Sequence, residues 1–69
     1  MFVGSNTEVQ LSYIVLEGIY YLEHIDDKGW DFLKGLDLGS EITLHKANGD
    51  EVNLIIVDLG SIRKAKVKS

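Results

Sequence analysis

Four basic residues near the C-terminal end of the chain have types and spacing that suit contact with phosphate groups. They are Arg63, Lys64, Lys66 and Lys68. Because the side chains of a strand alternate between its two faces, the three lysines share one face and form a ladder of positive charge. The sequence therefore predicts a ligand- or phosphate-binding surface at these residues, with a nucleotide or RNA as its ligand.

The histidines and the paired acids form no catalytic or metal-binding pattern. His24 and His45 are the only histidines, cysteine is absent, and the chain has neither a Gly-x-Ser-x-Gly segment nor a phosphate-binding loop. The acid pairs at residues 26–27 and 50–51 lie in expected turns, where Asp is favoured because it forms local hydrogen bonds. We therefore expect a protein that is not an enzyme and that holds no metal or other cofactor.

Large apolar residues predict a contact with another protein molecule. In residues 52–57, Ile55 and Val57 lie on one strand face, while Leu54 and Ile56 lie on the other. Strands that are apolar on both faces are usually buried on both, and a chain of 69 residues covers only one such face itself. Closure into a tight barrel is the alternative way to cover both faces. The predicted partner interface consists of Tyr20, Tyr21, Trp30, Phe32, Ile55 and Val57.

Size and charge narrow the range of partners. Residues 1–58 contain all eleven acidic residues and three lysines, a net charge of −8, whereas residues 59–69 add +4. An acidic body repels nucleic acid, so a protein is the favoured partner and nucleic acid the less favoured one. A core of this size supplies only about 3–5 kcal/mol of stability. Without cysteine for a disulfide, self-association is the remaining stabiliser, and we expect a homo-oligomer.

From the composition we expect a cytoplasmic protein. No run approaches the roughly 18 apolar residues of a membrane span, and the first residues lack the basic and apolar regions of a secretory signal. The absence of cysteine fits a reducing compartment. We expect one small β domain over residues 1–69, in which residues 1–6 form a flexible lead-in.

The first half of the chain reads as two strands followed by a turn. Apolar and polar residues alternate over residues 8–17, and β-branched and aromatic residues continue over residues 19–25, which favours strands. A helix at the N-terminal end is the alternative, since residues 5–8 match a capping box. After a turn at residues 26–29, residues 30–33 are expected to return antiparallel, with Asp31 beside His24. A short helix at residues 30–36 is the other interpretation.

The second half predicts a hairpin and a last strand. A three-residue loop at residues 47–49 places Ile42 opposite Leu54 and gives one wholly apolar face, with Gly49 left-handed. A turn at residues 59–61 leads into the last strand. The fold class is therefore all-β, a small antiparallel meander or barrel of five to six strands, and the alternative is an α+β fold with an N-terminal helix.

Residues 40–67 resemble the C-terminal half of a small SH3-like or Sm-like barrel. The resemblance lies in residues 42–44, the Asn48-Gly49 turn, residues 52–57 and the closing residues 61–67. It implies a short 3₁₀ turn at residues 59–62 before the last strand. It also implies a binding or assembly module, often oligomeric, that is not an enzyme.

Three functions follow from these observations. The first is a non-enzymatic, self-associating β-barrel binding module that uses the apolar face of Ile55 and Val57. The second is a small acidic inhibitor or adaptor, of the kind found in phages and mobile elements, that binds another protein. The third is a nucleotide or RNA binder that uses the C-terminal lysine ladder.

Overall fold

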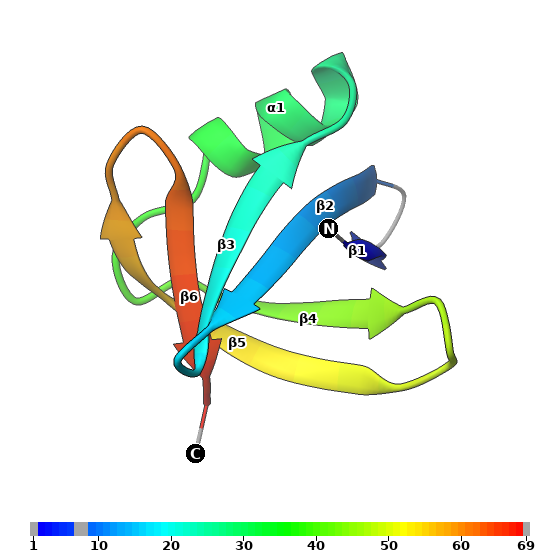
Figure 1. Cartoon of the computed structure of the whole chain (residues 1–69). Helices are drawn as coiled ribbons and strands as arrows, with labels where there is room; N and C mark the ends of the chain where they lie inside the picture. The colour runs from blue at the N-terminus through cyan, green and yellow to red at the C-terminus, as the bar shows by residue number, and fades with distance from the viewer. Residues whose placement is uncertain (1, 7–8, 69) are drawn as a thin grey trace.

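Six antiparallel strands close into a barrel, and one short helix lies across one end of it (Figure 1). The computed structural model describes residues 2–6 and 9–68. The elements are β1 (Phe2–Asn6), β2 (Val9–Leu16), β3 (Ile19–His24), α1 (Asp27–Lys34), β4 (Glu41–Lys46), β5 (Glu51–Leu59) and β6 (Arg63–Val67). Around the barrel the strand order is β1-β2-β3-β6-β5-β4, and β4 pairs with β1 to close the sheet. The all-β prediction and its small barrel are confirmed.

Strands β2 and β3 form a hairpin, so the alternative of an N-terminal helix is wrong. Leu16 pairs with Ile19 across a two-residue turn. Both turn residues are left-handed, Glu17 with φ 52° and Gly18 with φ 80°. Two such residues make the tight turn whose twist matches that of the flanking strands. Gly18 therefore lies in the turn itself.

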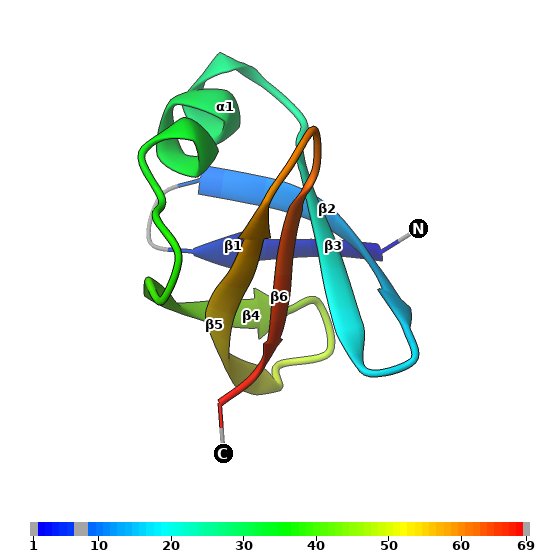
Figure 2. The same cartoon turned by 90° about the vertical axis from the view of Figure 1, so that its left-hand side faces the viewer.

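The flexible lead-in predicted for residues 1–6 is wrong over residues 2–6, which form strand β1, and residue 1 lies outside the described residues. This strand pairs with β2 at five positions and with β4 at two, Gly4 with Lys46 and Ser5 with His45. It thereby closes the barrel between the two halves of the chain (Figure 2). The pairing satisfies backbone groups along β2 and β4 that would otherwise lie at a sheet edge. The five residues of β1 do not by themselves indicate that they pair with these strands.

Residues 30–33 belong to helix α1, so the prediction of a returning strand is wrong and the helical interpretation is closer. Asp26 caps the helix, since its side chain accepts a hydrogen bond from the backbone N of Gly29 at 2.9 Å. Leu33 is buried in the core. The pairing of His24 with Asp31 is not formed, because Asp31 points from the helix to Lys34, with 3.0 Å between their charged atoms. No helix in the described part of the chain is long and apolar enough to span a membrane.

Replacing Asp26 with Ala is expected to lower the free energy of unfolding by about 1 kcal/mol, because the first turn of α1 loses its cap. Urea unfolding followed by circular dichroism measures this loss. Asp26→Asn is the matched control, since its side-chain oxygen caps equally well and stability is retained. Equal stability of Asp26→Ala and the wild type would contradict the capping role.

The β4–β5 hairpin has the predicted register and loop. Ile42 pairs with Leu54, and Gly49 is left-handed with φ 95°. The backbone N of Lys46 donates to the Asp50 carbonyl at 2.7 Å, which closes the three-residue loop. At the next connection, residues 60–62 form a bend, so the 3₁₀ turn implied by the SH3-like resemblance is not present there.

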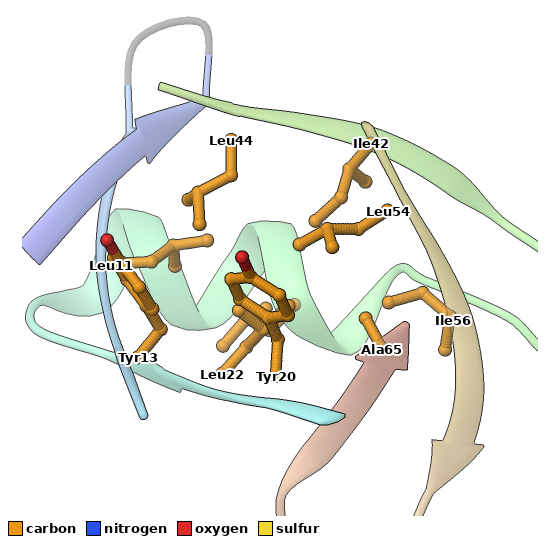
Figure 3. Packing of buried hydrophobic residues seen from close by; sticks show 10 residues of the cluster. Leu11, Tyr13, Tyr20, Leu22, Ile42, Leu44, Leu54, Ile56 and Ala65 are labelled. Carbon is orange, nitrogen blue, oxygen red and sulfur yellow. The ribbon is translucent and has the colours of Figure 1, made fainter. Parts of the chain in front are cut away.

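The core fills the barrel between the six strands and α1. It consists of Leu11, Tyr13, Tyr20, Leu22, Leu33, Ile42, Leu44, Leu54, Ile56 and Ala65. Figure 3 shows side chains from opposite walls of the barrel meeting in its centre, with Leu44 and Leu54 facing Tyr20 and Leu22. The alternation predicted for β5 is confirmed, because Leu54 and Ile56 are buried while Val57 is exposed.

Candidate functional site

The outward side chains of the neighbouring strands β2, β3, β6 and β5 form one surface of the barrel, which we call the outer face. Its residues are Ile14, Leu16, Ile19, Tyr21, Lys64, Lys66, Ile55 and Val57. One cross-strand row runs from Leu16 through Ile19 and Lys66 to Ile55. A second row runs from Ile14 through Tyr21 to Lys64. Two apolar strips therefore flank a central pair of lysines.

Several apolar side chains of the outer face are exposed to solvent. Leu16 is 57% exposed, Ile14 41% and Val57 39%, while Ile19, Tyr21 and Ile55 are half-buried. A hollow of about 130 Å³ lies beside Ile14, Leu16 and Tyr21. The apolar surface is contiguous where Ile14 and Leu16 pair with Tyr21 and Ile19, and such a surface marks a site of contact with another molecule.

The charges on the outer face are nearly balanced. The Nζ atom of Lys64 lies 3.5 Å from an Asp58 carboxylate oxygen and 5.5 Å from the centre of the Tyr21 ring. Lys66 makes no ion pair with any described residue. The outer face thus has one unpaired charge, and it is positive, in a chain whose net charge is −4.

The four basic residues predicted to bind phosphate do not act as one surface. Arg63 turns toward the helix, where its Nε donates to the Leu33 carbonyl at 3.2 Å and Nη1 donates to the Gly60 carbonyl at 3.3 Å. Lys68 pairs with Glu41, and Lys64 pairs with Asp58. Only Lys66 among the four keeps its charge fully available, so phosphate binding stays a prediction.

A second cluster lies where α1 meets the start of β6. The Arg63 guanidinium lies 5.7 Å from the Trp30 ring centre, and the His24 ring lies 5.3 Å from it. These three side chains border a cavity of about 260 Å³. The contacts of Arg63 with the last turn of α1 explain its position, because they satisfy a helix carbonyl and attach the helix to the barrel.

The predicted partner interface is divided by the fold. Tyr21, Ile55 and Val57 do share the outer face, whereas Trp30 belongs to the cluster at α1. Tyr20 is only 6% exposed and lies in the core, so its placement at an interface is wrong. Phe32 packs partly buried against the core.

The sequence interpretation missed Ile14 and Leu16, which belong to the outer face. Ile14 lies between Tyr13 and Val15 and pairs with Tyr21, and Leu16 follows Val15 and pairs with Ile19. The alternation of side chains places them on the face opposite to buried Tyr13, and this signal was present in the sequence. Residues 8–17 were predicted to form a strand, but its outward residues Ile14 and Leu16 were not assigned to an interface.

The other ionisable residues do not gather into a catalytic or metal-binding group. His45 Nδ1 lies 3.5 Å from a Glu51 carboxylate oxygen on the neighbouring strand, and both side chains are exposed. Within residues 2–6 and 9–68, no three His, Cys, Asp or Glu side chains are placed to hold a metal ion. These contacts are those of ordinary surface pairs between strands.

No protein-family model, no curated protein and no solved structure matched the chain. The function is therefore inferred from the surfaces of the barrel.

Proposed function

We propose that the protein is a non-enzymatic β-barrel module that self-associates through its outer face. The observation that supports this proposal is the row of six apolar side chains on the outward side of β2, β3 and β5. Burial of exposed apolar surface stabilises an assembly in proportion to the area removed from water. A domain whose own core is small gains most from such burial.

The charge distribution favours a second copy of the same chain as the occupant of the outer face. Two copies with a net charge of −4 repel each other wherever their acidic surfaces meet. On the outer face the Asp58 carboxylate is paired with Lys64, and the remaining charge is the cation of Lys66. Two copies therefore meet there with less repulsion than at the acidic residues around α1.

The closed barrel determines how the copies would meet. Each described strand pairs with a neighbour on both sides, and only the contact of β1 with β4, which has two paired positions, leaves a short stretch of sheet edge. Association would therefore use side chains from the outer face. A stable interface buries about 600 Å² or more on each partner. That is a modest share of the 4480 Å² surface of one chain.

The resemblance to SH3-like or Sm-like barrels is part of this proposal. Small barrels of that kind are binding and assembly modules, which agrees with a contact surface on the barrel wall. The chain departs from the resemblance at the bend of residues 60–62 and at the helix between β3 and β4. The resemblance therefore supports an assembly role in general and no specific ligand.

An acidic adaptor that binds another protein is the second candidate. Exposed acids surround α1, among them Glu23, Asp26, Asp27, Asp31 and Asp37. They would suit a basic partner surface. The nucleotide or RNA binder has less support, because Lys64 and Lys68 are paired with acids and Arg63 contacts backbone carbonyls.

Replacing Ile14 with Glu is expected to convert the assembly into monomers of about 7.7 kDa, because each contact would bury an unpaired carboxylate. Sedimentation equilibrium over a range of concentrations measures the mass. Linkage predicts in addition that the thermal unfolding midpoint of the wild type rises with protein concentration, whereas that of Ile14→Glu does not.

Ile25→Glu is the matched control. Ile25 is 50% exposed and lies between β3 and α1, outside the outer face, so the same substitution there should leave the mass of the assembly unchanged. Circular dichroism establishes that both variants are folded. A wild-type protein that sediments as a 7.7 kDa monomer at every concentration up to its solubility limit would refute self-association.

A further inference from the structure

The barrel has another hollow, which none of the eight outer-face residues lines. It measures about 390 Å³ and is lined by Val3, Tyr13, Val15, Lys46, Ala47 and Asn48. We call these six residues the barrel mouth. In Figure 2, α1 lies at the upper left and the β4–β5 loop, which contributes Ala47 and Asn48, lies at the lower right. The lining residues belong to β1, β2, β4 and the β4–β5 loop, and none of them belongs to α1.

The walls of the barrel mouth are apolar. Val3 and Val15 are 49% and 39% exposed although they belong to paired strands. Behind them the Tyr13 and Tyr20 rings stack with centres 5.7 Å apart. Figure 3 shows both tyrosines crossing the barrel with their hydroxyl groups directed to the same side, toward Leu44 of β4. The mouth thus offers aliphatic side chains at its rim and aromatic rings beneath.

Lys46 places a single positive charge at this apolar hollow. Its Nζ atom lies 5.8 Å from the centre of the Tyr20 ring. Its backbone N and O both bond within the β4–β5 loop, to Asp50 and Gly49, so the base of the side chain is fixed. Lys46 is half-buried and forms no ion pair with any described residue, although the chain contains eleven acids.

A half-buried lysine without an acidic partner is less common than a fully exposed one, because burial of a charge is unfavourable unless the charge is paired. Lys64 and Lys68 of the same protein do have acidic partners, and Lys66 is fully exposed to water. Among the lysines of the described residues, only Lys46 combines partial burial, an aromatic neighbour and an apolar hollow without an acidic partner, and Arg63 at the other cavity donates to two backbone carbonyls. A positive charge beside an apolar hollow suits a ligand that has a negatively charged group and a hydrocarbon part.

We propose that the barrel mouth binds a small apolar carboxylate, with the carboxylate on Lys46 Nζ and the hydrocarbon part against Val15 and the Tyr13 ring. Barrel mouths are frequent ligand sites, and pockets for small molecules begin at about 300 Å³. The hollow is therefore of a size for a short fatty acid or an aromatic acid. The eight residues of the outer face do not line this hollow. Ligand binding at the barrel mouth can therefore be tested independently of self-association.

Sodium octanoate is the probe, and amide NMR spectra of the full chain are the measurement. Saturable shifts are expected at Val3, Tyr13, Val15 and residues 46–48, while Ile55, Val57, Lys64 and Lys66 of the outer face are unaffected. Octanol, which has the same chain without the charge, should bind at least about tenfold more weakly, because an interaction with an ionised group is lost. Benzoate in place of octanoate distinguishes an aromatic from an aliphatic acid as the preferred ligand.

Lys46→Met keeps an unbranched apolar side chain and removes the charge, so it should weaken octanoate binding about tenfold or more while the octanol affinity stays unchanged. Lys66→Met is the matched control, since it removes the same charge from the outer face and should leave octanoate binding as in the wild type. Absence of saturable shifts at the barrel mouth would overturn the proposal. Equal weakening by the two lysine variants would also overturn it, because the effect would then come from net charge alone.

Discussion

Replacing Leu54 with Ala is expected to leave a large part of the protein unfolded at 25 °C. Leu54 has no exposed surface, lies in the middle of β5 and pairs with Ile42 on one side and Val67 on the other. Truncation of a buried Leu lowers the free energy of unfolding by about 2–5 kcal/mol, because apolar contacts are lost and a cavity remains. A core of this size supplies only about 3–5 kcal/mol in total.

The measurement is urea unfolding at matched protein concentration, extrapolated to water. Leu38→Ala is the control, because Leu38 is 65% exposed in the connection between α1 and β4 and the same truncation there should change stability by less than about 0.5 kcal/mol. If Leu54→Ala lost no more stability than Leu38→Ala, the assignment of Leu54 to the centre of the core would be wrong.

Replacing Gly4 with Ala is expected to destabilise the protein by about 1–3 kcal/mol, although Ala is normally tolerated in a strand better than Gly. A Cβ atom at this position would lie 2.7 Å from Cδ1 of Leu44 and 3.1 Å from the carbonyl oxygen of His45. The carbonyl belongs to the backbone of β4 and cannot move without disturbing the pairing of β1 with β4. That pairing has only two positions, so the closing contact of the barrel would weaken.

Gly60→Ala tests whether this effect is specific. The nearest atoms to a Cβ at Gly60 are the Asp58 carboxylate oxygens at 3.7 and 3.9 Å, which is ordinary contact. Its stability should therefore stay within about 0.5 kcal/mol of the wild type. In a double-mutant cycle, Leu44→Val removes the Cδ1 atom, and Gly4→Ala should then be less destabilising than in the wild-type background. A fully additive cycle would show that the contact with Leu44 is not the cause.

The structure of the second half of the chain depends more on interactions between residues close in sequence than that of the first half does. The β4–β5 hairpin was predicted with its register, because Asn48-Gly49 determines the loop and one-residue slippage would turn apolar side chains to the wrong face. The alternation along β5 likewise predicted which side chains enter the core. Strands β2 and β3 were predicted for the same reason, although the helical alternative stayed open.

The segment after β3 shows where local patterns are ambiguous. Trp30, Phe32 and Leu33 fit a short strand and a short helix almost equally well in the sequence. Capping by Asp26 and burial of Leu33 against the barrel favour the helix. The second of these contributions exists only once β2 and β3 are in place, because α1 packs on them. A local pattern does not contain that information.

The candidate surfaces were predicted in part. The sequence identified Ile55 and Val57 as outward residues, but it placed buried Tyr20 in the same interface and omitted Ile14. Pairing of β3 with β6 decides that Tyr21 lies beside Lys64. The barrel mouth was not predicted, since its lining comes from three separate parts of the chain.

The sequence by itself thus determined the strands of the second hairpin, their register and the inward or outward direction of their side chains. These properties depend on side-chain alternation and turn chemistry over a few neighbouring residues. Only the tertiary structure decided that β1 closes the barrel, that Lys64 and Lys68 are paired with acids, and that Lys46 stays unpaired at an apolar hollow. The physical reason is that each of these features joins residues far apart in the chain, and their distances are determined by barrel closure.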